Sequence, residues 1–223
     1  MLVQIPAVLE NQELSALRAA LAEARFEDGM ATGMPGARRA KHNLQLPENG
    51  EAARRLAPTV LDALRRHPLF FSATLPKRIS GPLFNRYDAG SDYGDHFDTA
   101  LIQAPALVRS DIAATLFLTS PQDYDGGELV IQDTFGAHRV KLPAGNMIVY
   151  PASSLHRVEA VTRGSRLAAV LWVESLVRDE SRRRILFDLD QTIGSLAQKM
   201  PGGIEGQTLS MTYHNLLRMW AET

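Results

Sequence analysis

Three side chains of this sequence have the types and spacing of a metal site built from nitrogen and oxygen ligands. His96 and Asp98 stand two residues apart, after a strand-like run and a glycine turn. Side chains at positions i and i+2 of an extended chain point to the same side, so both can bind one ion while Phe97 turns away into packing. His156 lies far along the chain in a β-branched, apolar context and is the candidate third ligand. Two histidines and one carboxylate with open coordination positions are typical of non-haem Fe(II) oxygenase sites.

A fourth residue, Arg166, predicts an anion close to this metal site. It begins the run RLAAVLWV (166–173), which is apolar on both faces and therefore belongs in the middle of a sandwich. A guanidinium in such a layer is costly unless an anion meets it. Its planar fork suits a carboxylate, so a dicarboxylate co-substrate would supply the partner. The alternative is an arginine at a strand end that points outward into solvent.

Short strands punctuated by glycine and proline must position these residues. From Leu69 onward, β-branched and aromatic runs follow one another at 78–87, 112–119, 128–132, 138–142, 147–150, 156–162 and 166–174. Turns are predicted at Asp125-Gly126-Gly127 and at 143–146, where residues that tolerate positive φ occur. Regularly spaced short strands indicate a sandwich or barrel, and we expect a mainly β fold with a double-stranded β-helix (jelly-roll) core.

Helical periodicity flanks the strands on both sides. The first helix is expected to begin with Asn11 as its cap, and the second to cover 48–67, where Pro58 should kink or divide it. After Ser175, two apolar stripes at helical spacing are separated by the breaker at 200–203. The sequence thus predicts a helical support segment at 1–68, a jelly-roll core at 69–176 and a C-terminal helical extension at 177–223, which packs on the sandwich or on a partner subunit.

Composition narrows the class of protein. The 223 residues are 45% hydrophobic and 22% charged, which argues against disorder and against membrane spanning. A net charge of −1 gives no field that would gather nucleic acid. The chain has no cysteine, so disulfides and thiolate ligands are excluded. Residues 1–9 lack the basic and apolar regions of a signal peptide, and we expect a cytoplasmic location.

Taken together, these residues resemble a known family. The sequence carries, in order, Tyr87, His96-x-Asp98, Gly126-Gly127-Glu128-Leu129, Gly145-Asn146-Met147, His156 and Arg166. This pattern is similar to that of the Fe(II)- and 2-oxoglutarate-dependent dioxygenases of the prolyl-hydroxylase type. More narrowly, LFNRY (83–87) and YPASSLHRV (150–158) resemble the bacterial PKHD-type hydroxylases, the PiuC-like proteins. The resemblance covers most of the chain.

The resemblance implies a reaction and a role for each residue. It implies that Fe(II) is held by His96, Asp98 and His156, that Arg166 binds the 5-carboxylate of 2-oxoglutarate, and that the phenol of Tyr87 donates to the oxoacid. Tyr87 can also be read as an aromatic core residue. The products would be succinate, CO2 and a hydroxylated substrate, with O2 consumed and L-ascorbate supporting activity. Halogenases of the same superfamily have a small residue in place of the carboxylate. Because Asp98 is intact, hydroxylation is favoured.

Several alternatives stay open at this stage. The substrate can be a peptidyl proline, a free amino acid or a siderophore-related small molecule linked to iron uptake. A non-catalytic metal-binding jelly roll acting as a sensor or interaction module would keep the same triad, as would a cupin-like isomerase or a metal hydrolase. The C-terminal helices can form a homo-oligomer contact. The basic cluster Arg38, Arg39 and Lys41 is read as a solvated loop or as a mobile lid over the substrate. The remaining histidines, His42, His67, His138 and His214, are predicted to be surface or capping residues.

Overall fold

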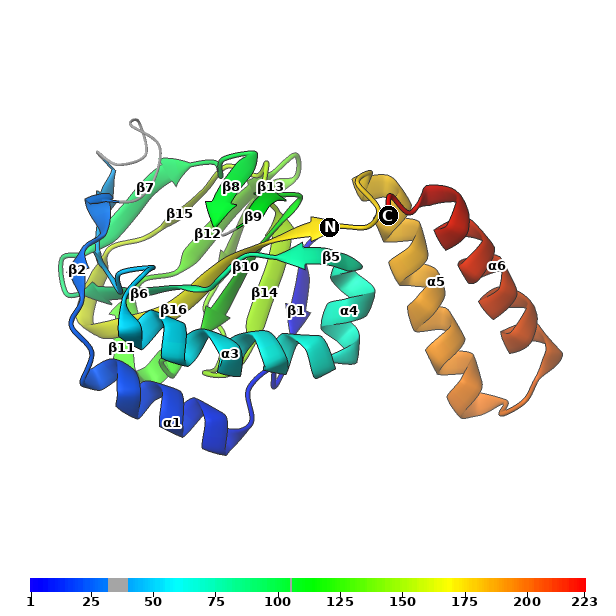
Figure 1. Cartoon of the computed structure of the whole chain (residues 1–223), viewed down its shortest axis with the longest axis horizontal. Coiled ribbons are helices and arrows are strands. Elements are labelled where there is room, and N and C mark those ends of the chain that lie inside the picture. The colour runs from blue at the N-terminus through cyan, green and yellow to red at the C-terminus, as the bar shows by residue number, and fades with distance from the viewer. Residues whose placement is uncertain (32–39, 105) are drawn as a thin grey trace.

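The computed structural model describes residues 1–31, 40–104 and 106–223, and its centre is a pair of antiparallel sheets with helices along one side (Figure 1). The large sheet has the strand order β1 (Val3–Ile5), β14 (Met147–Pro151), β10 (Ile112–Phe117), β16 (Val161–Ser175), β6 (Leu83–Asp88), β4 (Leu44–Gln45) and β2 (Glu27–Asp28), with β5 (Pro76–Ile79) and β11 (Tyr124–Gly126) also paired to β16. The small sheet has the order β13 (Gly136–Val140), β12 (Leu129–Asp133), β15 (His156–Val158), β7 (Asp92–His96) and β3 (Lys41–His42). A separate hairpin joins β8 (Leu101–Ala104) to β9 (Ala106–Arg109). The predicted mainly β jelly-roll core with flanking helices is confirmed.

Two apolar layers hold this core together. The inner layer lies between the sheets and includes Phe117, Leu129 and Tyr150. The outer layer lies between the large sheet and the N-terminal helices, where Leu17 and Leu64 pack with Leu171. Alternate residues of a strand face opposite sides, so the apolar run of β16 supplies both layers. This explains why its sequence is apolar on both faces.

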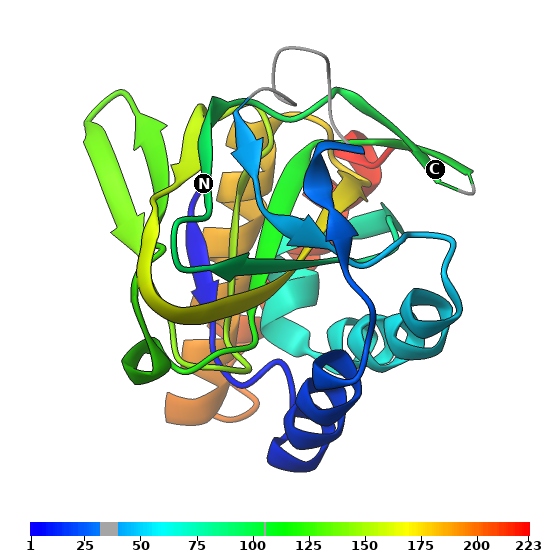
Figure 2. The same cartoon turned by 90° about the vertical axis from the view of Figure 1, so that its left-hand side faces the viewer.

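The N-terminal helices α1 (Asn11–Ala22) and α3 (Glu51–Arg66) support the large sheet, as expected (Figure 2). The cap of α1 was predicted wrongly: Glu10 is the N-cap, and its backbone N–H donates to the Glu13 carboxylate at 2.9 Å. Asn11 is already helical because this reciprocal arrangement satisfies the first free donors. Pro58 does not divide α3, which is one unbroken helix.

A short helix, α4 (Pro68–Thr74), stands where the sequence was expected to turn to β structure. The prediction is wrong here because the end signals outweigh the strand-like Leu-Phe-Phe composition. Pro68 occupies the first turn, the ring of His67 accepts from the Phe70 N–H at 3.4 Å, and Leu75 closes the helix in the left-handed conformation. The first strand after it is β5.

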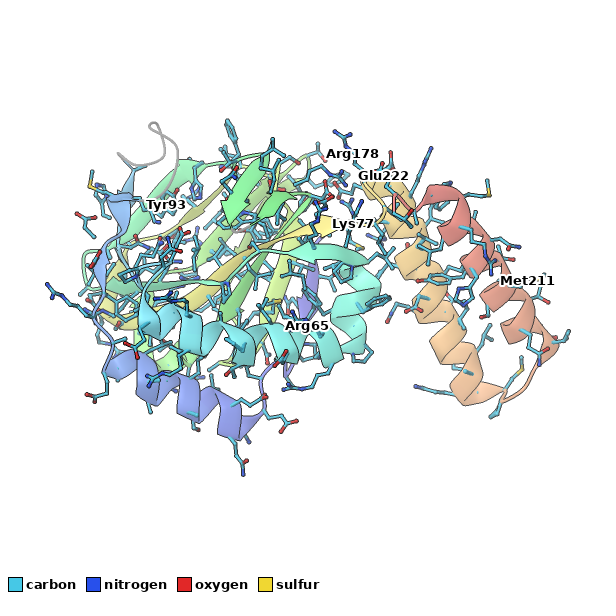
Figure 3. All side chains as sticks on the ribbon, in the orientation of Figure 1. Arg65, Lys77, Tyr93, Arg178, Met211 and Glu222 are labelled. Atoms are coloured by element: carbon cyan, nitrogen blue, oxygen red, sulfur yellow. The ribbon has the colours of Figure 1, made fainter. Side chains whose placement is uncertain are left out.

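The C-terminal segment is a helical hairpin of α5 (Glu180–Lys199) and α6 (Ile204–Trp220) that projects beside the core (Figure 1). The predicted break at 200–203 is confirmed. The hairpin is anchored at its base, where the buried Arg183 donates to the backbone carbonyls of Val177 and Arg178 at 2.7 Å each. Its buried cluster joins Leu186 to Leu75 and Val177, while Met211 lies on the outer face of α6 (Figure 3). The hairpin therefore packs on the end of the core, beside α4.

Replacing Leu186 with Ala is expected to lower the free energy of unfolding by about 2–5 kcal/mol, because the side chain is fully buried and its removal leaves a cavity. Urea denaturation followed by circular dichroism measures the change. Met211→Ala is the matched control, since that side chain is 60% exposed and its loss should change stability by less than about 0.5 kcal/mol. Equal stability of the two variants would contradict the described packing of the hairpin.

Within the described residues, no helix combines the length and the apolar character needed to cross a lipid bilayer.

Candidate metal and co-substrate site

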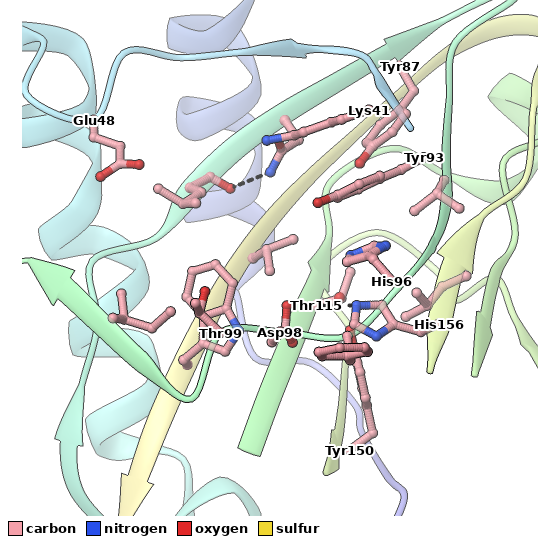
Figure 4. Close-up of a pocket in the computed structure, with 18 of the residues that line it drawn as sticks. Lys41, Glu48, Tyr87, Tyr93, His96, Asp98, Thr99, Thr115, Tyr150 and His156 are labelled. Atoms are coloured by element: carbon pink, nitrogen blue, oxygen red, sulfur yellow. Dashed lines mark hydrogen bonds and ion pairs between the residues drawn. The ribbon is translucent and has the colours of Figure 1, made fainter. Parts of the chain in front are cut away.

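Strand pairing brings the three predicted metal ligands together. His96 ends β7, Asp98 follows two residues later, and His156 begins β15. The two strands are antiparallel neighbours, and their register places His156 directly opposite His96. One possible ligand atom from each of the three residues lies within 4.8 Å of the others (Figure 4). Residues separated by about sixty positions in sequence thus form one cluster.

Both histidines are oriented in the same way. The Nδ1 atom of His96 is 2.8 Å from the carbonyl of Gly94, and that of His156 is 2.9 Å from the carbonyl of Ser154. A carbonyl only accepts, so Nδ1 carries the proton in each ring and Nε2 keeps its lone pair. The Nε2 atom of His156 lies 3.9 Å from an Asp98 carboxylate oxygen. A hydrogen bond at Nδ1, the ring nitrogen that does not face the ion, is how metal-binding histidines are commonly held in place.

The electrostatics of the cluster also suit a cation. Burial, followed by the neighbouring His156, lowers the pKa of His96 to about 4, so this ring is neutral near pH 7. Burial raises the pKa of Asp98, an effect opposed by His156 and by the indole of Trp172. One oxygen of Asp98 is buried without a hydrogen-bond partner in the described structure. Two imidazole nitrogens and an under-satisfied carboxylate are a donor set that fits Fe(II).

Phe97 does not turn away into packing as predicted. Its side chain is 63% exposed and lines the same cavity as the metal ligands. β7 ends at His96, so no second sheet face is available to bury the ring after that point. His96 and Asp98 still converge on one cluster although Asp98 lies beyond the end of the strand, and the residue between them faces an open cavity instead of a core.

The cavity has a volume of about 350 Å³ and extends from the metal cluster along the inner faces of β6 and β16. Arg166 and Tyr87 pair with one another in the register of these strands, and both line it. Val170 and Trp172 line it further along β16, and Leu101 of the β8–β9 hairpin lines it as well. The cavity therefore reaches from the triad to the predicted arginine.

Arg166 is buried to 1% exposure and does not point into solvent as the alternative reading supposed. Its guanidinium lies 5.1 Å from the ring centroid of Tyr87 and 5.2 Å from that of Phe117. In the part of the chain that the structure describes, no carboxylate forms an ion pair with it, and its Nε has no hydrogen-bond partner. A buried guanidinium without an anion is costly, so its environment favours an anionic ligand.

Tyr87 is buried beside Arg166, and burial raises the pKa of its phenol while Arg166 opposes the shift. The phenol therefore stays protonated and can donate a hydrogen bond. The ring belongs to the inner core as well, so the two readings of this residue are compatible. Its role toward the oxoacid stays a prediction.

Two further residues touch the site: Tyr93, which sequence reasoning treated as a less certain candidate than Tyr87, and Lys41, which it placed in the basic cluster as part of a solvated loop or a lid. Tyr93 stacks on His96 with ring centroids 3.6 Å apart, although a spacing of three normally places strand residues on opposite faces. A bulge explains the contact: between the paired positions Tyr93↔Val158 and His96↔His156, two residues of β7 oppose one residue of β15. Lys41 is only 5% exposed and donates to Gln45 at 2.7 Å, and burial lowers its pKa to about 8.

The solvated-loop reading of the basic cluster is thus wrong for Lys41, which lines the cavity, while Arg38 and Arg39 lie outside the described residues. The other histidines behave as predicted. His42 pairs with Asp92 and His138 with Asp133 at the surface, His67 caps α4, and His214 is exposed.

Comparison with known proteins agrees with this geometry. The family model of the 2OG-Fe(II) oxygenase superfamily matches residues 82–174, and that of the PKHD-type hydroxylase C-terminal domain matches residues 180–222. A PKHD-type hydroxylase of Hyphomonas neptunium is 54% identical, and the PKHD-type hydroxylase PiuC of Pseudomonas aeruginosa is 48% identical, each over the full length of both chains.

Solved structures show the same fold at lower identity. A Pseudomonas putida prolyl-4-hydroxylase has a TM-score of 0.51 and 21% identity, covering 78% of this chain and 92% of its own. A prolyl hydroxylase from Trichoplax adhaerens, in complex with a hypoxia inducible factor peptide fragment, has a TM-score of 0.56 and 14% identity, covering 83% of this chain and 86% of its own. From its full-length relatives, the chain belongs to the PKHD-type hydroxylases of the 2OG-Fe(II) oxygenase superfamily, and it is an Fe(II)- and 2-oxoglutarate-dependent oxidoreductase.

Proposed function

We propose that His96, Asp98 and His156 hold the catalytic Fe(II), and that Arg166 and Tyr87 hold 2-oxoglutarate beside it. One observation carries this assignment: a buried guanidinium that has no ion-pair partner among the described residues lines the same cavity as a convergent His-Asp-His cluster. A dicarboxylate placed between them would neutralise the guanidinium with its far carboxylate and direct its 2-oxo acid end to the metal.

The groups around the metal ligands have distinct parts in this proposal. The backbone carbonyls of Gly94 and Ser154 fix the two imidazoles with Nε2 toward the ion. One buried oxygen of Asp98 has no hydrogen-bond partner among the described residues, which leaves it free to bind the ion. Bound iron supplies the dioxygen chemistry that couples the conversion of 2-oxoglutarate into succinate and CO2 to hydroxylation of a substrate C–H bond. We also propose that L-ascorbate supports activity by keeping the iron reduced.

The substrate is proposed to be a small molecule or one residue of a peptide. The size of the cavity supports this, because about 350 Å³ is at the small end of ligand pockets and also has to hold the co-substrate. Phe97 and Leu101 offer exposed apolar surface along its wall. A peptidyl proline, a free amino acid and a siderophore-related molecule all stay within this class, and the link to iron uptake stays a prediction.

We propose that the chain is organised as a helical support segment at 1–68, the oxygenase core at 69–176 and an extension at 177–223. The extension contains the part of the chain that matches the PKHD-type C-terminal domain. Apolar side chains such as Ile204 and Met219 are exposed on α6 and support a homo-oligomer contact there. A cytoplasmic location and the absence of nucleic acid as a partner stay predictions from composition.

The enzymatic reading is tested by incubating the full-length protein with Fe(II), 2-oxoglutarate, ascorbate and ¹⁸O-labelled dioxygen, in cell extract and in buffer. Formation of succinate is expected in both, and in the extract one metabolite or peptide should gain a single labelled oxygen. The hydroxylase names of the full-length relatives disfavour the non-catalytic sensor, and the buried Arg166 disfavours an isomerase or hydrolase, which needs no 2-oxoglutarate. Metal binding without any succinate, with or without extract, would restore the sensor.

A further inference from the structure

The hydroxyl of Tyr124 is a buried polar group that the assignments above leave unused. Tyr124 begins β11, which pairs with the first part of β16 through Gly164. The residue is completely buried, and its Oη atom has no hydrogen-bond partner in the parts of the chain that the structure describes. Buried hydroxyls are nearly always paired, so an unpaired one calls for an explanation.

Tyr124 and Arg166 lie against the same glycine. A Cβ atom on Gly127 would come within 3.0 Å of Tyr124 Cε2 and within 3.1 Å of Arg166 Cδ. Gly127 also has a φ of +67°, a conformation that other residues rarely adopt. A side chain at this position would push the phenol or the arginine stem out of place. The glycine thus allows the two polar side chains to approach one another.

The two groups offer hydrogen-bond donors without an acceptor. Burial raises the pKa of Tyr124, while the nearby positive charge of Arg166 opposes this shift, so the phenol keeps its proton. Arg166 Nε also has no hydrogen-bond partner among the described residues. Two unpaired donors beside one buried positive charge are complementary to an anionic oxygen.

We propose that Tyr124 is a further co-substrate-binding residue, whose hydroxyl donates to the far carboxylate of 2-oxoglutarate together with Arg166. This inference rests on the proposed function, because it needs a dicarboxylate at Arg166. It adds a donor from β11, a strand other than those that carry the metal ligands and Arg166.

A purely structural role explains the ring of Tyr124 but not its hydroxyl. The ring belongs to the inner apolar layer, and the ammonium of Lys141 lies 4.0 Å from its centroid. The same ammonium donates to the backbone carbonyl of Tyr124 at 2.9 Å. A phenylalanine would keep each of these contacts. Removal of the hydroxyl alone therefore separates the two roles.

The test compares Tyr124→Phe with the wild-type chain, both full-length and loaded with Mn(II), by isothermal titration calorimetry. The probes are 2-oxoglutarate and 2-oxobutanoate, which has the same oxoacid end but no far carboxylate. Loss of a hydrogen bond to a charged group should weaken 2-oxoglutarate binding about tenfold in the variant. Binding of 2-oxobutanoate should not change. Tyr213→Phe, which removes a hydroxyl from the distant C-terminal hairpin, should match wild type with both probes.

Thermal unfolding gives a second readout that a structural role would not reproduce. Without 2-oxoglutarate, Tyr124→Phe should melt at the wild-type temperature or above it, since the lost hydroxyl was buried and unpaired. With saturating 2-oxoglutarate, its increase in Tm should be smaller than that of wild type.

Three results would count against the inference or its premise, and they are distinguishable. Wild-type affinity for 2-oxoglutarate in Tyr124→Phe overturns the role of the hydroxyl. If Tyr124→Phe binds 2-oxoglutarate and 2-oxobutanoate more weakly to the same extent, the assignment of the hydroxyl to the far carboxylate is overturned. Failure of the wild-type, metal-loaded chain to bind 2-oxoglutarate overturns the proposed function itself.

Discussion

Replacement of His96 with Ala is expected to abolish the Fe(II)-dependent conversion of 2-oxoglutarate to succinate. Loss of a partner that only orients a metal ligand commonly lowers metal affinity 10- to 100-fold, so loss of a ligand should cost at least about 100-fold. The substitution would leave only Asp98 and His156 of the three candidate ligands in this cluster. Calorimetric titration with Mn(II) and quantification of succinate measure the two effects.

His138→Ala is the matched control for this substitution. That histidine is exposed on β13 and pairs with Asp133 at 2.7 Å, away from the cavity. Its removal should leave metal affinity and succinate formation at wild-type levels. A metal-dependent rise in Tm that persists unchanged in His96→Ala would show that the ion binds elsewhere and would remove the basis of the site.

The metal site was predictable because it depends on rules that act along short stretches of chain. The two-residue period of an extended chain predicted that His96 and Asp98 lie on one side, although β7 itself ends at His96, and the resemblance supplied His156. The register of β7 against β15 then joins them, and this register cannot be read from composition. Arg166 was predictable for another reason: a charged residue in a run that is apolar on both faces requires a buried partner.

The errors of sequence reasoning occur where local patterns meet irregular backbone. Phe97 was expected in a core because strand alternation was extended beyond the end of β7. The contact of Tyr93 with His96 depends on a bulge, and the helix α4 depends on its capping residues. The role proposed for Tyr124 arises from tertiary contact with Arg166 across β11 and β16. None of these features leaves a periodic signal in the sequence.

Replacement of Arg166 with Met is expected to separate co-substrate binding from folding. Met keeps much of the apolar length of the side chain and removes the fork that would bind the far carboxylate. We expect 2-oxoglutarate affinity to fall about 100-fold or more, measured by calorimetry on the Mn(II)-loaded chain, because a paired buried charge contributes several kcal/mol to binding. Metal affinity should be unchanged, since Arg166 is not part of the His-Asp-His cluster.

The thermal stability of Arg166→Met in the absence of 2-oxoglutarate should not fall with its affinity for 2-oxoglutarate. The guanidinium lies between the rings of Tyr87 and Phe117 without an ion-pair partner in the described structure, so its removal should leave Tm unchanged or raise it. Arg166→Lys provides the comparison, because it keeps the charge but not the planar fork, and should bind 2-oxoglutarate with intermediate affinity. A fall in Tm of Arg166→Met with unaltered 2-oxoglutarate affinity would mean that the arginine stabilises the inner layer of the sandwich and binds no co-substrate.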